Sequence, residues 1–236
     1  MLIQADQSGR GQAFAAKWAE IVFVIYHSFA DAKKEYASFK AAVAAAGRDP
    51  ARVHVAPACY VCVGESEAVA LDKRAVIHAT ARDVDALVLL SEVLNYDFAK
   101  KPIDEPFSDE ELAELSFQGF RDRVIRHSGK RNPTVRDFIT VSGRGTVKEH
   151  TMFCGNPQQV ADQIEEWFTA PACDGFVLAA SSMPGAYDDV VRLLVPELQR
   201  RGLFQKDYAG PTLRDNLGLA IPRAADWHAA RRALVR

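Results

Sequence analysis

The chain has 236 residues, of which 48% are hydrophobic, and its formal net charge at pH 7 is -2. A chain of this length can bury one substantial core, and its near-neutral charge gives no bias toward nucleic acid or anionic membranes. No apolar run reaches the ~20 residues of a spanning helix, and the first ten residues lack the basic start and apolar centre of a signal peptide. We therefore expect a cytoplasmic protein that binds neither nucleic acid nor membrane.

The first strand and the turn after it predict an anion site. Residues 2–5 form a short strand, residues 6–11 a polar turn containing Ser8, and residues 14–19 an amphipathic helix. Free backbone N–H groups, a serine hydroxyl and the positive end of the helix dipole converge at such a turn. The alternative is that Ser8 only caps the helix.

Strand and helix then alternate. Residues 20–25 predict a buried strand, residues 31–46 a helix that stops at Gly47, and residues 53–63 a third strand that bends at Pro57. Right-handed connections between such strands build a parallel sheet whose functional loops lie at the carboxyl ends of the strands. His27 follows the second strand at that end and is therefore our candidate for a substrate contact, whereas His54, within a strand, is expected in the core.

The four cysteines, Cys59, Cys62, Cys154 and Cys173, do not form a disulfide framework in a chain of this length. The spacing of Cys59 and Cys62 within an apolar strand places them on opposite faces of the strand. We interpret them as core residues, although a CxxC pair also occurs in redox and zinc sites. No histidine grouping forms a metal motif, so no metal ligand is assigned.

Residues 71–150 break the alternation. Helical patches occur at 84–90, 109–113 and 117–127, and another helix starts at Thr134. A long insertion after a barrel strand is typical of a lid or substrate loop. Its polar, proline-marked connection at 100–106 is expected to open locally at low free energy.

The last unit is the most strongly patterned. Asn156 and Pro157 predict a capped helix start, and residues 175–180 form a wholly apolar run, which is typical of a strand covered on both faces. A second helix follows, with Val190 and Val191 among its inward residues, and Gly202 ends it.

Four blocks of this chain, at 155–162, 174–176, 195–204 and 208–219, closely resemble the luciferase-like flavin monooxygenases. The resemblance is to the branch that contains the nitrilotriacetate and dibenzothiophene-sulfone monooxygenases. Because the order and spacing of all four blocks agree, the resemblance is specific and covers most of the chain.

The resemblance implies the carboxyl-terminal half of a TIM (β/α)8 barrel, with four parallel strands, covering helices and a long helical insertion. We expect residues 1–222 to form this half-barrel, with the insertion or lid at 71–150 and a tail at 223–236. The four amino-terminal strands of the family are absent from this sequence. Two unpaired sheet edges and an apolar inner face would then be open, so we expect a homodimer or a partner that supplies the missing amino-terminal half.

The resemblance also implies the chemistry. Family members oxidise a small organic substrate with dioxygen, using reduced FMN from a separate NAD(P)H-dependent flavin reductase, a transient partner. Their phosphate-binding pattern, Gln-Ala-Gly-x-Ser, is matched by Gln4, Ala5, Gln7 and Ser8, with Asp6 in place of the glycine. We therefore expect Asp6, Gln7 and Ser8 at the flavin phosphate and His27 at the substrate or flavin.

The family's catalytic residues belong to its amino-terminal half, so no catalytic residue is assigned. The alternative is a non-catalytic truncated half-barrel that binds phosphate, flavin or a partner weakly.

Overall fold

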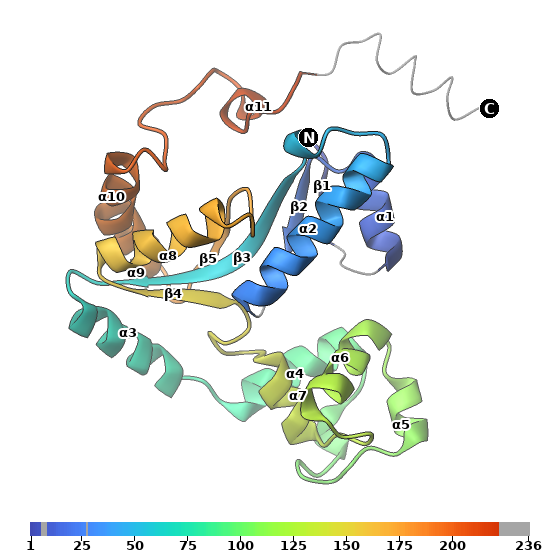
Figure 1. Cartoon of the computed structure of the whole chain (residues 1–236). Helices are drawn as coiled ribbons and strands as arrows, with labels where there is room; N and C mark the ends of the chain where they lie inside the picture. Colours follow the sequence, from blue (N-terminus) through green and yellow to red (C-terminus); the bar gives the residue numbers. More distant parts are fainter. Residues whose placement is uncertain (6–8, 27, 222–236) are drawn as a thin grey trace.

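The computed structural model describes residues 1–5, 9–26 and 28–221. Its centre is a sheet of five strands, β1 (Ile3–Gln4), β2 (Ile21–Val24), β3 (His54–Val63), β4 (Thr151–Gly155) and β5 (Val177–Ala179). Every pairing between these strands is parallel, and helices cover the sheet (Figure 1). The predicted fold class is confirmed, with β4 as an additional strand that the sequence analysis did not predict.

β3 is the long central strand. Its first half pairs with β2 and its second half with both β4 and β5. His54 N donates to Glu20 O on the β2 side, and Gly64 N donates to Gly155 O on the β4 side. Both donors are even-numbered residues, and alternate residues of a strand direct their backbone groups to the same edge. β2 and β4 therefore follow one another along one edge of β3, and β5 occupies the other edge.

One face of the sheet packs against helices. These are α1 (Gly9–Trp18), α2 (Phe29–Ala45), α8 (Pro157–Thr169) and the continuous helical segment α9 (Gly185–Asp189), η3 (Val190–Leu194) and α10 (Val195–Arg200). The alternate residues of β3 that face this layer belong to the main hydrophobic core: Val53, Val55, Cys59, Val61 and Val63. The opposite face of β3 is partly buried at His54, Ala56 and Tyr60, whereas Ala58 and Cys62 on that face are buried, Cys62 against α3 (Glu67–Ala79).

Asp174 ties the start of the β5 segment to the rest of this core. Its carboxylate accepts hydrogen bonds from Tyr36 OH at 2.8 Å and Val55 N at 2.7 Å, and it pairs with Lys40 Nζ at 2.9 Å. Tyr36 and Lys40 lie one turn apart on α2 and therefore share a face of this helix. One carboxylate therefore joins a helix, the central strand and the segment that leads into β5.

The insertion has a second hydrophobic core. It contains α3 (Glu67–Ala79), α4 (Asp83–Leu94), α5 (Asp109–Glu114), α6 (Gln118–Ser128) and α7 (Val135–Ser142), and Figure 1 shows α4 to α7 gathered in one bundle away from the sheet. A short 3-10 helix, η2 (Phe98–Lys100), contributes to the same core. Another 3-10 helix, η1 (Pro50–Arg52), precedes β3 in the sheet. The largest fully buried side chains of this core are Leu90, Leu94, Phe98, Phe107, Leu115 and Phe138.

The connection at 100–106 is more strongly anchored than its composition suggested. The Lys101 side chain is only 4% exposed and pairs with Glu111 at 2.9 Å and Glu105 at 3.1 Å. Pro106 bridges to Thr134. The sequence showed the polar residues but not their distant partners, so the structure removes the reason to expect easy opening here.

In the last unit the predicted helix start is confirmed, but the predicted burial of two residues is wrong. The Asn156 side chain accepts from Gln159 N, and the Gln159 side chain accepts from Asn156 N, as the predicted capping box requires. Val191 was predicted to face inward and is instead 66% exposed, since the buried face of this segment runs through Val190 and Leu194 and leaves Val191 at its margin. Val177 of β5, expected to be covered on both faces, is 39% exposed.

The segment after α10 returns to the beginning of the chain. In α11 (Leu213–Asn216), Arg214 pairs with Glu20, and the Leu217 carbonyl lies 3.0 Å from His54 Nε2. His54 is therefore a partly buried residue with a partner, as expected. None of the helices within the described ranges is both long and apolar enough to cross a membrane.

Candidate functional site

All four residues that the sequence placed at a site lie outside the described residues: Asp6, Gln7, Ser8 and His27. Their neighbours are described. β1 ends at Gln4 and α1 begins at Gly9, so the predicted phosphate turn connects a parallel strand to a helix start. The order of elements that the anion-site prediction requires is therefore present.

The beginning of α1 suits an anion. Its described first turn contains no acidic residue, and a Cβ added at Gly9 would meet nothing within 4 Å, so the helix start is open. Arg10 is exposed, and the described residues provide no ion pair for it. The positive end of the helix dipole favours a bound anion here.

The other end of α1 is fixed by Arg48. The Arg48 guanidinium donates to the carbonyls of Ala15 at 3.4 Å, Ala16 at 3.0 Å and Ala19 at 2.7 Å. These carbonyls carry the negative end of the helix dipole, so a cation is the appropriate partner. Burial lowers the pKa of Arg48. These three hydrogen bonds fix the orientation of α1, whose opposite end follows the predicted phosphate turn.

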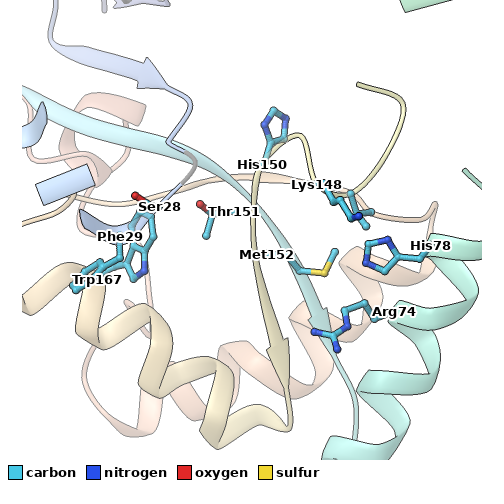
Figure 2. A pocket seen from close by; sticks show the side chains of 10 residues that line it. Ser28, Phe29, Arg74, His78, Lys148, His150, Thr151, Met152 and Trp167 are labelled. Atoms are coloured by element: carbon cyan, nitrogen blue, oxygen red, sulfur yellow. The ribbon is translucent and has the colours of Figure 1, made fainter. Parts of the chain in front are cut away.

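A second feature is a cavity of about 390 Å³ beside β4, which we call the β4 pocket. It begins just beyond the carboxyl end of β2, where Thr151 Oγ1 donates to Tyr26 O at 3.0 Å. Figure 2 shows Ser28, Phe29 and Trp167 on one side of β4 and Met152, Arg74, His78 and Lys148 on the other. The ten lining residues are Ser28, Phe29, Arg74, His78, Val147, Lys148, His150, Thr151, Met152 and Trp167.

His150 forms part of the wall of this pocket. Its ring lies 5.0 Å from the Tyr60 ring, and among the described residues its Nδ1 is buried without a hydrogen-bond partner. Burial lowers the pKa of His150 below its usual value, against the opposing effect of Glu149. Burial therefore favours the neutral imidazole.

The turn before β4 positions Lys148 and His150. Gly143 ends α7 with a φ of 61°, and a Cβ there would lie 2.8 Å from the Lys148 carbonyl carbon. Only glycine allows this conformation together with such a close approach. Arg144 of the same turn pairs with Glu149 at 2.8 Å. Residues 143–148 thus form a packed turn that places Lys148 at the border of the pocket.

A second cavity, of about 520 Å³, lies between α3, the end of β3 and the start of α9. Its lining is mostly apolar, and its Lys73 pairs with Asp189. Cys62 borders it, and burial raises the pKa of this thiol to about 11. Cys59 is also buried, which supports the core interpretation of both cysteines. The described residues contain no group of three or more His, Cys, Asp or Glu side chains that could hold a metal ion.

Sequence reasoning did not find the β4 pocket. It assigned His78 to a surface helix and Arg74 and Lys148 to no site, because α3 and the turn before β4 are 70 residues apart along the chain. One local signal was available. Arg74 and His78 are four residues apart and therefore share a face of a helix.

Comparison with known proteins identifies the relatives of this chain. The family model described as luciferase-like monooxygenase matches residues 3–173. Nitrilotriacetate monooxygenase component A of Aminobacter aminovorans is 35% identical over 225 residues, which are 94% of this chain and 49% of that protein. The chain therefore spans about half the length of the curated relatives it matches.

Solved structures agree with this comparison. DmoA from Hyphomicrobium sulfonivorans superimposes with a TM-score of 0.71 at 32% identity, over 91% of this chain and 44% of that one. A riboflavin lyase solved with modified FMN and riboflavin gives a TM-score of 0.75 over 92% of this chain and 46% of that one, at 24% identity. At that identity the second likeness shows the fold alone.

Proposed function

Because the chain belongs to the luciferase-like monooxygenase family, we propose that it functions in a flavin-dependent monooxygenase that oxidises a small organic substrate with dioxygen. The observation that carries the proposal is the family match over residues 3–173, which includes the unit from β1 to α1. The whole reaction is a proposal for this chain, since it spans half the length of its relatives. A cytoplasmic location likewise stays a prediction.

We propose that the cofactor is FMN, bound through its phosphate at the start of α1. The positive end of the α1 dipole and the Arg10 side chain supply positive charge, and Gln7 and Ser8 are the proposed side-chain contacts. Reduced FMN, delivered by a separate NAD(P)H-dependent reductase, would supply the electrons for the reaction with dioxygen. The residues of this chain hold and orient the cofactor, and no catalytic residue is assigned among them.

Titration of FMN fluorescence tests the phosphate assignment. Asp6→Gly should tighten FMN binding, because a carboxylate ~4 Å from a phosphate charge costs about 1 to 4 kcal/mol, depending on the local dielectric. Ser8→Ala and Arg10→Gln should weaken it. Arg126→Gln, which removes an exposed arginine from α6, is the matched control. Equal affinities for all five proteins would contradict a phosphate site at this turn.

The insertion at 71–150 is proposed as a lid within a half-barrel of residues 1–222, with a tail at 223–236. Two features support this proposal: the insertion has its own apolar core, and Arg74, His78 and Lys148 all lie on the border of the β4 pocket. Deletion of α4 to α7 should therefore change substrate oxidation more than FMN binding. Loss of FMN binding alone would contradict the lid assignment.

The second candidate function is a non-catalytic half-barrel that binds phosphate, flavin or another chain weakly. The half-length match to the relatives favours it. Dioxygen consumption in the presence of FMN, NADH and a flavin reductase distinguishes the two. Substrate-dependent oxygenation by the purified chain supports the enzyme, whereas FMN binding without oxygenation supports the remnant.

The exposed apolar side chains suggest that the half-barrel assembles with a partner, either a second copy or an amino-terminal half. Ile3 on β1 is 54% exposed, and Phe14 and Trp18 on α1 are 49% and 45% exposed. Symmetric dimers are the commonest oligomers, and pairing would cover the edge of β1. Light scattering tests this. A monodisperse, cooperatively melting monomer would remove the argument for a partner.

A further inference from the structure

The β4 pocket is lined by basic side chains and by no carboxylate. Arg74 and His78 share one face of α3, and Lys148 comes from the turn before β4. Figure 2 shows all three on the same side of β4, near Met152. Neither Arg74 nor Lys148 forms an ion pair with any residue that the structure describes, so two positive charges face one cavity without a counter-charge.

This lack of partners does not arise from a shortage of carboxylates nearby. Lys73, next to Arg74 on α3, pairs with Asp189 at 2.5 Å, and Arg144, in the same turn as Lys148, pairs with Glu149. Asp189 and Glu149 are thus engaged by other cations. Arg74 and Lys148 are left with their charge directed at the pocket, where an anion from outside the chain would be stabilised.

The rest of the pocket combines apolar side chains with the polar residues Ser28, His150 and Thr151, and its size suits a small molecule. Phe29 and Trp167 form its aromatic side, with ring centroids 5.5 Å apart, and Val147 and Met152 add further apolar surface. A cavity of about 390 Å³ falls within the range of small-molecule sites. The partly buried His150 ring provides one more polar contact. Such a lining suits a ligand with an apolar body and a negatively charged group.

We propose that the β4 pocket binds a small organic carboxylate, with the carboxylate on Arg74 and Lys148 and the apolar body against Met152, which lies on the same side of β4. Under the proposed monooxygenase function, on which this step rests, the substrate is therefore an organic carboxylate with an apolar part. Guanidinium groups bind carboxylates through two parallel hydrogen bonds, which fixes the orientation of the ligand as well as its charge. Arg74 and Lys148 then determine specificity and have no role in bond breaking.

Calorimetric titration of the purified chain with phenylsuccinate tests the proposal without requiring turnover. Phenylsuccinate should bind, and its neutral diamide, which has nearly the same shape, should not. Arg74→Gln and Lys148→Gln should each weaken phenylsuccinate binding tenfold or more. Arg74→Lys should retain part of the affinity, and Arg126→Gln, on the exposed face of α6, should remain within twofold of the wild type. Circular dichroism of each variant confirms that it is folded.

Equal binding of diacid and diamide would overturn the proposal, as would unchanged affinity in the Arg74→Gln and Lys148→Gln variants. Inorganic phosphate and FMN form a further arm. If these bind in a manner that depends on Arg74 while phenylsuccinate does not bind, the pocket holds a phosphate group and the carboxylate assignment is wrong. FMN binding that depends on Ser8 and Arg10 tests the flavin proposal separately, so either proposal can fail while the other stands.

Discussion

Replacing Asp174 with asparagine should destabilise the fold by removing one charge at the point where three elements meet. In the structure the Asp174 carboxylate pairs with Lys40 Nζ at 2.9 Å and accepts from Tyr36 OH and Val55 N. Lys40 also donates to the carbonyls of Pro50 and Val53, so it is held in place whether or not its counter-charge is present. Asp174→Asn therefore leaves a fixed ammonium group without a carboxylate.

The size of the effect follows from burial. The Lys40 and Asp174 side chains are 13% and 21% exposed. Breaking a fully buried pair by removal of one partner costs about 3 to 5 kcal/mol, whereas exposed pairs contribute about 0 to 1 kcal/mol. For this largely buried pair we expect a loss of about 2 to 3 kcal/mol in the free energy of unfolding. Tyr36→Phe removes a single hydrogen bond and should cost about 1 kcal/mol.

Chemical denaturation of the wild type and both variants measures these losses. The double variant Asp174→Asn with Lys40→Met removes both charges and should recover part of the loss, since no unpaired ammonium remains. Hydrogen exchange should show faster opening at Val55, whose amide donates to Asp174. If Asp174→Asn changes the free energy of unfolding by less than about 0.5 kcal/mol, water screens the pair and the assignment of Asp174 as a structural centre is wrong.

Three further predictions concern charge and burial. Hydrogen bonds from two arginines lower the pKa of Glu197 to about 2, below its ordinary value of 4.5, so its contribution to stability is present above pH 4.5 and is lost as the pH falls toward 2. The melting-temperature difference between the wild type and Glu197→Gln should therefore shrink from pH 7 to pH 3, and an unchanged difference would rule out ion pairing as its source. Lys101→Gln should make the connection at 100–106 a site of early proteolysis, while the wild type should resist cleavage there. Burial raises the pKa of Cys59 to about 12 and of Cys62 to about 11, so iodoacetamide at pH 8 should label them only after unfolding, and rapid labelling of the native chain would contradict their core placement.

Local signals in this sequence predicted the helices well. A cap such as Asn156 acts on the three residues that follow it, so its effect can be recognised without knowledge of the fold. The helix predicted at residues 31–46 is also present as α2, and its Phe39 and Val43 are buried. The parallel sheet followed from the alternation of short apolar strands with helices.

Features that depend on distant partners were not predictable in the same way. β4 has only one β-branched residue, Thr151, and its strand character comes from pairing with β3, a segment that lies about 90 residues earlier. The β4 pocket likewise combines α3 with the turn before β4. Nothing in the sequence indicates that Arg74 and Lys148 lie close together. The turn itself offered a clue in Gly143, although its close approach to Lys148 appears only in three dimensions.

The burial of the strands shows a different kind of mismatch. Apolar residues on both sides of a strand predict that both faces are covered, and on that basis residues 175–180 should be fully buried. In the structure Val177 is exposed, and the side of β3 that carries His54, Ala56 and Tyr60 is only partly buried at these residues. Because the chain spans only half the length of its relatives, a natural explanation is that the apolar pattern was set by a barrel with more strands than this chain describes. The apolar run therefore predicts the strand correctly and its burial incorrectly, because burial depends on what covers the strand and not on its own residues.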